Sequence, residues 1–427
     1  MRDILLILSI CTLAFTCQAQ SLSIDELWAQ CSDHHALAKE KATAVKVQQE
    51  QLAIRRSAYL PVVYGDLDWQ RNLIIPTTPV PAIAFDPGAP EDAVIPLKFS
   101  TKWNSKAGLK LEWTLFDPKR KSNLSSDRIA EERAVLQEQE YHQDLKSAAT
   151  LAYAAVVLAT RQYKSAIEDS IQYAEIQEIV AQRFQAGRAT SDEYILAQQE
   201  LQRKRIRLHE SWTILQENSL DLGEYVDLTD IRVLSSDLSE IRKKLEAYRP
   251  HPFQIDLLQL DIRSAELDLR ALQKEVLPTL HFNAYFGAQF YSNDFHLFQH
   301  NNWYGHSFVN LGVRVPISAY FTQSASRKKA ALQQEIYTHR LEHQQYLEKS
   351  DEQKKQLRIA QAEAALSSRE KIEQLAEQKK TQKWAAYQSG RLLLSDYHLA
   401  HSEHLSAQQE VWQAQYDWLA ALLATGE

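Results

Sequence analysis

The sequence has few residues that break helices or cross-link chains: its 427 residues include ten glycines, twelve prolines and three cysteines. Two of the cysteines lie in the first 17 residues, so a chain without that segment keeps only Cys31 and forms no internal disulfide. There is no apolar run of about 18 residues, which excludes a membrane-spanning helix. The net charge of −7 comes from acidic and basic residues spread along the chain, which argues against a nucleic-acid surface.

The N-terminal segment, residues 1–19, has the features of an export signal. It combines Arg2, an apolar core from Ile4 to Phe15 and the small residue Ala19. The core is too short to span a bilayer, so we predict a signal that is removed close to Ala19. The alternative is a lipoprotein signal in which Cys17 is acylated.

Two stretches, residues 119–249 and 317–427, contain no proline. Their only glycines are Gly187 and Gly223 in the first stretch and Gly390 and Gly426 in the second. Because helix interiors exclude proline and disfavour glycine, each stretch predicts a helix, a turn at Gly187 or Gly390, and a second helix. The first helices, over 121–186 and 321–389, would each be about 100 Å long at 1.5 Å per residue. Helices of such length require lateral packing of the coiled-coil type.

Four segments in the rest of the chain alternate in polarity as strands do, near residues 63–72, 103–115, 280–290 and 306–317. A period of two over four segments predicts a sheet with one apolar and one polar face. The residues that we assign to the apolar face are Val63, Leu67, Trp69, Leu109, Leu111, Trp113, Phe282, Phe286, Leu311 and Val313. Those that we assign to the polar face are Asp66, Asp68, Lys106, Lys110, Asn283, Asn310 and Arg314.

The apolar face of this sheet needs a cover. In a water-soluble sheet, other parts of the chain would cover it. The helices here are mostly charged and glutamine-rich on all sides, so we favour lipid as the cover, with water on the polar face. An open sheet edge would leave backbone groups unpaired in hydrocarbon, so the sheet must close into a barrel. Four strands cannot enclose a lumen, but three copies of the chain supply twelve.

The chain also contains an internal repeat with an offset of 203 residues. Examples of identical pairs at this offset are Gly187 and Gly390, Arg188 and Arg391, and Tyr194 and Tyr397. Each copy consists of a helix, two strands, a long helix, a glycine turn and a helix. We therefore predict one repeat over residues 20–223 and another over 251–427, with an equatorial connector over 224–250.

This ordered set of features resembles the TolC-type outer-membrane factor family of outer-membrane efflux proteins. The resemblance is carried by the duplicated plan, the strand starts LPVVYGDLDW and LPTLHFNAYF, the strand exits LEWTLFD and VRVPIS, and the two Gly-Arg turns. It implies a mainly helical fold with a small β part. It also implies a homotrimer with a twelve-stranded transmembrane β-barrel in the outer membrane of a Gram-negative bacterium and a twelve-helix periplasmic tunnel.

The resemblance further implies a function and partners. The protein would be the exit duct of a tripartite efflux or type I secretion system. An inner-membrane pump of the RND or ABC type would drive cargo through it, and a periplasmic adaptor would link the two.

By position in the family, the two glycine turns form the periplasmic tip where the adaptor docks. The residues carried over are Gly187, Arg188, Thr190 and Asp192, and Gly390, Arg391, Ser395 and Asp396. From the residues alone, each glycine can adopt the left-handed conformation that ends a helix. Thr190 or Ser191, and Ser395, can cap the next helix, with Asp192 or Asp396 in its first turn. Helix ending and capping alone account for the presence of the glycine, threonine, serine and aspartate residues in these turns, but they do not account for the two arginines.

An enzyme or a metal site would have to rest on histidines. His398, His401 and His404 are spaced by three residues, and His339 and His343 by four, a spacing that can hold a metal. No carboxylate-bearing zinc signature, nucleophile elbow or glycine-rich phosphate loop accompanies them. We therefore interpret the histidines as mostly solvated helix surface and predict no catalytic residue, no metal and no cofactor.

The remaining alternative is a soluble periplasmic coiled-coil scaffold or adaptor. An adaptor usually has a compact β-rich domain on a single helical hairpin, which a duplicated plan does not supply. Fractionation separates the hypotheses, because the scaffold would be soluble and the channel would form detergent-dependent trimers.

Overall fold

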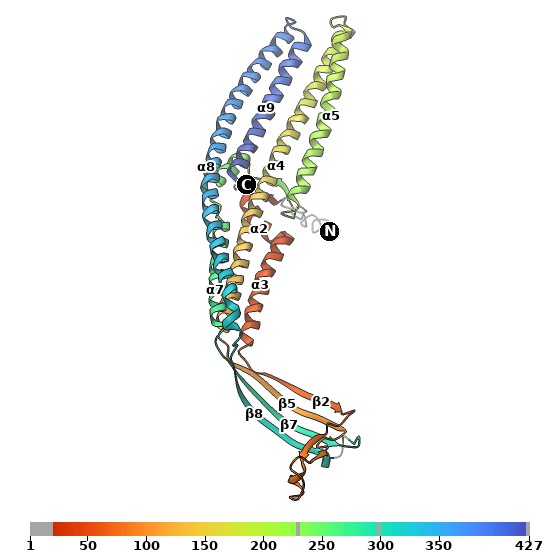
Figure 1. Ribbon diagram of the computed structural model, residues 1–427. Coiled ribbons are helices and arrows are strands. Elements are labelled where there is room, and N and C mark those ends of the chain that lie inside the picture. Colours follow the sequence, from red (N-terminus) through yellow and green to blue (C-terminus); the bar gives the residue numbers. More distant parts are fainter. Residues whose placement is uncertain (1–19, 228–230, 297–299, 424–427) are drawn as a thin grey trace, which may run out of the picture. The chain divides into compact units, whose positions relative to one another are not determined.

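The computed structural model describes residues 20–227, 231–296 and 300–423, which are mainly helical with a small β part, as predicted (Figure 1). The predicted export signal, with Cys17, lies outside the described residues. The elements in chain order are β1 (Gln20–Leu22), α2 (Ile24–His34), α3 (Ala36–Ser57), β2 (Val62–Arg71), β3 (Thr78–Pro81), η1 (Ala82–Ala84), β4 (Val94–Leu97), β5 (Trp103–Phe116), α4 (Arg120–Gln185), α5 (Ser191–Leu222), β6 (Ile231–Leu234), α6 (Leu238–Ala247), α7 (Phe253–Lys274), β7 (Thr279–Ser292), η2 (His300–Asn302), β8 (Trp303–Arg314), α8 (Ala319–Gln388) and α9 (Leu394–Leu423).

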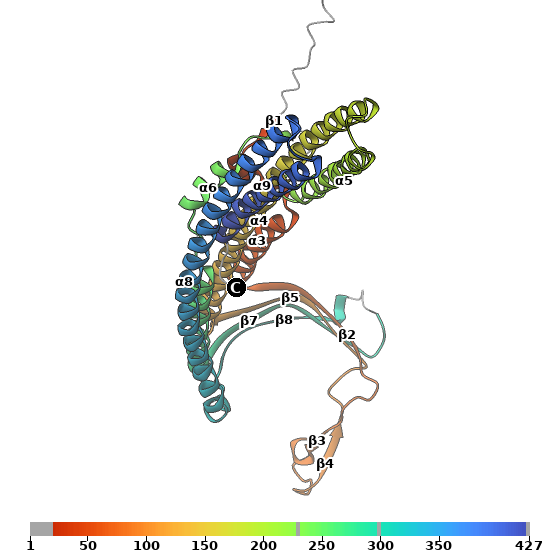
Figure 2. The same ribbon diagram turned by 90° about the horizontal axis from the view of Figure 1, so that it is seen from above.

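The two long helices, α4 and α8, lie within two residues of their predicted bounds. They run without interruption because proline and glycine are absent from their interiors. Each turns back at its glycine, so that α4 lies beside α5 and α8 beside α9 as two hairpins (Figures 1 and 2). In the part of the chain that the structure describes, no helix is both long and apolar enough to cross a membrane.

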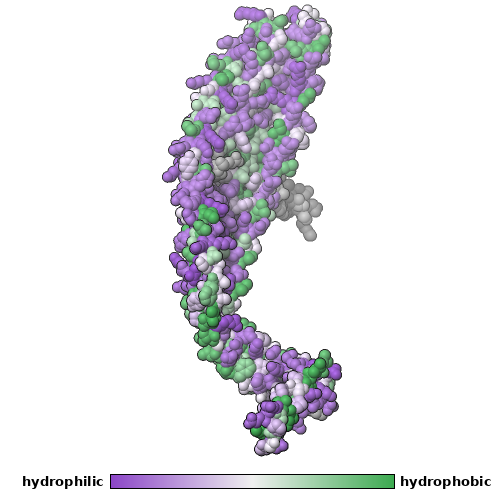
Figure 3. All heavy atoms as spheres, in the orientation of Figure 1, coloured by the Kyte–Doolittle hydropathy of each residue, from purple (hydrophilic) through white to green (hydrophobic). Residues whose placement is uncertain are grey.

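The described residues form two compact units, each assembled from segments that are far apart in the sequence. The first takes in the described parts of residues 1–45, 134–257 and 340–427, and the second those of 46–133 and 258–339. Both units draw on both predicted repeats. The side of the helices that Figure 3 presents is mostly hydrophilic. The repeat and connector boundaries predicted from the sequence stay predictions.

The core of the first unit lies around Tyr153 of α4, which is fully buried. Its hydroxyl donates to the carbonyl oxygen of Leu22 at 2.7 Å and accepts from the backbone N–H of Ser236 at 3.0 Å. These bonds hold the parallel pair of β1 and β6 against α4. Helix α6 packs nearby, with the Arg242 guanidinium 3.9 Å from the centre of the Trp418 ring of α9. The segment predicted as a connector is therefore a packed part of this core.

The second unit contains a four-stranded antiparallel sheet in the order β2-β5-β7-β8. The central pair, β5 and β7, comes from the two different repeats. The segment between β2 and β5 carries a separate two-stranded hairpin of β3 and β4. Strands β2 and β8 are the two edges of the large sheet.

Candidate channel and docking surfaces

One face of the large sheet is apolar. Directly paired residues of antiparallel strands point to the same side, and the register sets Leu109 opposite both Gly65 and Phe286. By the same register, all ten residues predicted for the apolar face lie on one side of the sheet. They include strongly exposed side chains, such as Phe286 at 77 % and Leu67 at 74 %. The chain thus presents a large apolar surface to its surroundings.

The other face of the sheet is polar. The register sets Asp68 opposite Lys106 and Asn283 opposite Asn310, and all seven residues predicted for this face lie on it. The Lys110 ammonium lies 2.7 Å from a carboxylate oxygen of Glu112. The structure thus confirms the two-faced pattern, and the assignment of lipid to one face and water to the other stays a prediction.

Aromatic residues gather at both ends of the apolar face. At the loop end, the rings of Trp69, Trp103 and Phe295 have centres 4.6–6.2 Å apart. Toward the other end, the Trp113 indole donates to the carbonyl oxygen of Tyr59 at 2.9 Å. Ten residues separate Trp103 from Trp113, about 33 Å along a strand. A strand tilted by about 40° then spans about 25 Å, the height of the apolar band of outer-membrane proteins.

Two glycines, Gly108 and Gly287, face each other in the centre of the polar face. A Cβ atom on Gly108 would lie 2.6 Å from the carbonyl oxygen of Phe286 and 2.8 Å from the hydroxyl of Tyr285. Only glycine permits this close approach of the strands, and the Tyr285 side chain is buried there. The sequence analysis missed this pair, because the atoms that exclude a side chain at Gly108 belong to the neighbouring strand β7.

The two helix turns share one geometry. Gly187 has φ +71° and Gly390 has φ +72°, which confirms the predicted left-handed conformation. The backbone N–H of Arg188 donates to the carbonyl oxygen of Arg183 at 2.7 Å, and that of Arg391 to Ala386 at 3.0 Å. These bonds close each helix in a Schellman-type motif.

The predicted capping residues behave differently in the two turns. Thr190 caps α5, because its hydroxyl accepts from the backbone N–H of Glu193 at 3.2 Å. Asp192 and Asp396 lie in the first turns of α5 and α9, as predicted. The prediction that Ser395 caps α9 is wrong, because that helix already begins at Leu394. The docking role of these turns is not tested by this geometry and stays a prediction.

A buried polar cluster joins the two helical hairpins. The carboxylate of Asp169 on α4 lies 2.9 Å from the Lys204 ammonium of α5 and 2.5 Å from Nε2 of His401 on α9. Nδ1 of His398 lies 2.8 Å from the hydroxyl of Tyr173. All five side chains are buried. The cluster therefore ties α4, α5 and α9 together through charged and polar groups.

Burial sets the protonation states in this cluster. It lowers the pKa of His398 from 6.5 to about 4, and the charges of His401 and Lys204 act in the same direction. Burial alone would raise the pKa of Asp169, but its bonds to His401 and Lys204 outweigh this effect and lower the pKa. At neutral pH His398 is therefore neutral and Asp169 is ionised.

The interpretation of these histidines as solvated surface is wrong. His398, His401 and His404 are buried, since α9 turns the face that carries them toward α4 and α8. Nε2 of His404 lies 2.7 Å from a carboxylate oxygen of Glu377 on α8. Within the described ranges, no group of three or more His, Cys, Asp or Glu side chains is placed to hold a metal ion. The spacing therefore serves helix packing.

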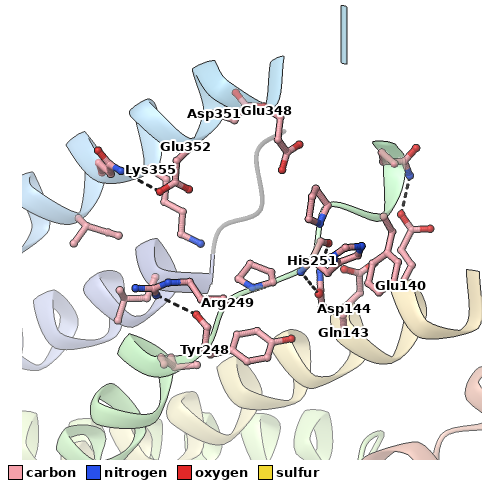
Figure 4. Close-up of a pocket in the computed structure, with 18 of the residues that line it drawn as sticks. Glu140, Gln143, Asp144, Tyr248, Arg249, His251, Glu348, Asp351, Glu352 and Lys355 are labelled. Atoms are coloured by element: carbon pink, nitrogen blue, oxygen red, sulfur yellow. Dashed lines mark hydrogen bonds between the residues drawn. The ribbon is translucent and has the colours of Figure 1, made fainter. Parts of the chain in front are cut away.

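A polar cavity of about 510 Å³ opens in the first unit between α4, α8 and the segment that enters α7 (Figure 4). The charged residues that line it are Glu140, Asp144, Arg249, Glu348, Asp351, Glu352 and Lys355. Burial raises the pKa of Asp144 and lowers that of Lys355. Ligand pockets are typically apolar with a few polar groups, so we assign this mostly acidic cavity no ligand.

Three solved structures share this architecture over nearly the whole chain. The open-state MtrE outer-membrane channel of Neisseria gonorrhoeae has a TM-score of 0.69 at 14% identity, covering 94% of this chain and 87% of that chain. The CmeC outer-membrane channel of Campylobacter jejuni gives 0.66 at 16%, covering 94% and 84%. CusC, described as folding into a transmembrane channel, gives 0.72 at 14%, covering 94% and 90%. No protein-family model and no curated protein matches the chain.

This chain has the fold of the TolC-type outer-membrane channels. The predicted resemblance is thereby confirmed for the fold. At identities this low, the similarity shows the fold alone. The function is therefore inferred from the sheet faces and the helix turns.

Proposed function

We propose that this chain is the channel subunit of a tripartite efflux or type I secretion system in the outer membrane of a Gram-negative bacterium. Three copies would close their sheets into a twelve-stranded barrel, and their helices would form a twelve-helix periplasmic tunnel. The channel would be a passive duct without catalysis, driven by an inner-membrane pump through an adaptor that docks at the Gly187 and Gly390 turns.

The exposed apolar face of the sheet carries this proposal. Leu67, Phe286 and Val313 are each at least 65 % exposed. Most of their neighbours on the same face are apolar as well, such as Ala107 opposite Leu67, Leu109 opposite Phe286 and Leu280 opposite Val313. Water-soluble proteins rarely expose an apolar patch larger than a few hundred Å², because each Å² in water costs about 25 cal/mol. Lipid removes that cost, and the aromatic ends of the face fit the two boundaries of a bilayer.

A stripe along α8 supports packing between copies. The exposed apolar residues of this helix include Leu332, Ile336, Tyr346, Leu357, Ile372 and Leu375. Their spacings follow a repeat of 3.6 residues, so they form one line along the helix. A helix in the wall of a tube needs such a lateral seam with its neighbour. The similarity to solved outer-membrane channels supports the same arrangement.

Fractionation tests the proposal directly. We expect the full chain to remain in the outer-membrane fraction, to require detergent for extraction and to give a trimer on chemical cross-linking. Reconstitution of that trimer into planar bilayers should produce channel conductance. A water-soluble monomer would instead support the scaffold or adaptor hypothesis.

A further inference from the structure

We propose that Arg71 binds the phosphate of an anionic lipid headgroup in the outer leaflet of the membrane. This inference rests on the proposed function, because only a sheet embedded in a bilayer would bring a headgroup to Arg71.

Arg71 lies at the loop end of the apolar face. It is the last residue of β2, and the register sets it opposite Trp103, the first residue of β5. Directly paired residues point to the same side, so Arg71 shares the face of Trp103 and Trp69. The other ends of β2 and β5 lead to the helices α3 and α4, which would be periplasmic in the proposed channel. Arg71 would then lie at the outer surface of the membrane.

The Arg71 guanidinium lies over an aromatic ring and keeps its donors free. Its Cζ atom is 5.3 Å from the centre of the Trp103 ring, which itself packs against Trp69 and Phe295. Such a cation–π contact provides no acceptor oxygen for the N–H groups of the guanidinium. Among the described residues, the exposed Arg71 side chain has no ion-pair partner and no hydrogen-bond partner. Its N–H donors are therefore available to a molecule outside the chain.

The opposite end of the same face differs in this respect. There the Cζ atom of Arg120 lies 4.5 Å from the centre of the Tyr59 ring. Nη2 of Arg120 donates to the carbonyl oxygens of Ala58 at 3.2 Å and Thr114 at 2.8 Å. Both ends thus place an arginine on an aromatic ring, but the described part of the chain supplies acceptors for Arg120 and none for Arg71.

A lipid phosphate suits the surroundings of Arg71. A guanidinium can donate parallel N–H bonds to two phosphate oxygens. The rings of Trp69, Trp103 and Phe295 would contact the glycerol region of the same lipid, as aromatic residues do at membrane boundaries. Leu67 is strongly exposed on the same face and would contact the acyl chains. A free phosphate ion gains nothing from these apolar groups, so the site favours a phosphate that is attached to a lipid.

Native mass spectrometry of the full-length trimer tests this inference. The trimer in detergent is titrated with phosphatidic acid, or with phosphatidylcholine, whose choline group neutralises the phosphate, and the bound lipids are counted. We expect phosphatidic acid to bind about fivefold more tightly, and Arg71→Gln to reduce this preference to less than about twofold. Lys106→Gln is the matched control, because it removes a positive charge from the polar face and should keep the preference. Added inorganic phosphate should not displace the lipid.

Equal binding of the two lipids by the wild type would overturn the inference and leave the channel proposal intact. A preference that Arg71→Gln retains, or that Lys106→Gln loses to the same extent, would also overturn it, because Arg71 would then not be the source of the preference. Displacement by inorganic phosphate would make a free anion the ligand and would exclude the lipid. A water-soluble monomer would overturn the proposed channel and this inference with it.

Discussion

At the scale of single residues, Asp169 holds the polar cluster together. It is the shared partner of Lys204 and His401, and all three side chains are buried. A buried ion pair contributes little when complete, but removing one partner leaves an uncompensated charge away from water. The cluster therefore makes the contact between the hairpins sensitive to single changes.

We expect Asp169→Asn to destabilise the protein by about 3–5 kcal/mol, because the Lys204 charge loses its partner. The double variant Asp169→Asn/Lys204→Met should recover much of that loss, since it removes both charges. Chemical denaturation of the detergent-solubilised protein measures both. A single variant as stable as the wild type would show that the ion pair has no structural role.

His398 predicts a dependence of stability on pH. Because its folded-state pKa is about 4 against an ordinary value of 6.5, the unfolded chain binds more protons between these values. Its contribution is full above about pH 6.5 and falls as the pH drops, by up to about 3 kcal/mol.

The His398→Gln variant isolates this contribution while keeping a hydrogen-bonding group for Tyr173. Denaturation midpoints between pH 7 and pH 4.5 should fall less steeply in the variant than in the wild type. Equal slopes would mean that His398 is not buried in its neutral form.

At the scale of elements, the chain builds the same helix turn twice. In both turns the left-handed glycine lets the next backbone N–H reach a carbonyl five residues earlier. The backbone thereby closes each helix on its own, so the exposed side chains of Arg188 and Arg391 are not needed for the turn. This leaves both arginines available for the docking role that we propose.

We expect Gly187→Ala and Gly390→Ala each to cost about 1–2 kcal/mol, because an L-residue is strained in the left-handed conformation. No atom lies within 4 Å of an added Cβ at either site, so steric clashes add nothing. Gly223→Ala is the control, since Gly223 is right-handed with φ −62°, and it should be neutral or stabilising by up to about 1 kcal/mol. Thermal unfolding measures the stability of the three variants. Equal changes in stability in all three would contradict the role of the left-handed conformation.

At the scale of the whole molecule, a single chain exposes unpaired strand edges and apolar surface that favour association with other molecules. The sheet has two open edges and an exposed apolar face, and α8 carries an apolar stripe along its length. Association of copies in a membrane satisfies all three features at once. In the proposed channel, export would depend on contacts that the trimer makes with its partners.

We expect the charge-reversing double variant Arg188→Glu/Arg391→Glu to lower export at least about tenfold, from the loss of charged contacts worth about 1.5–3 kcal/mol each. Trimer assembly and membrane insertion should be unchanged. Arg203→Glu/Arg205→Glu, two exposed arginines on α5, is the matched control. Normal export by the first variant would remove the docking assignment.

The sequence by itself determined the features that follow from local rules. Proline and glycine positions gave the long helices to within two residues, period-two alternation gave the two faces of the sheet, and the glycines gave the left-handed turns. Each of these depends on the backbone of a few neighbouring residues, so the pattern is visible in one segment.

Only the tertiary structure decided which segments meet. The pairing of β5 with β7, the close approach of Gly108 and Gly287, and the burial of His401 against Asp169 each join residues more than 150 positions apart. A histidine on a polar helix looks solvated until the facing helix supplies its carboxylate. Such partners come from long-range packing, which a local pattern does not encode.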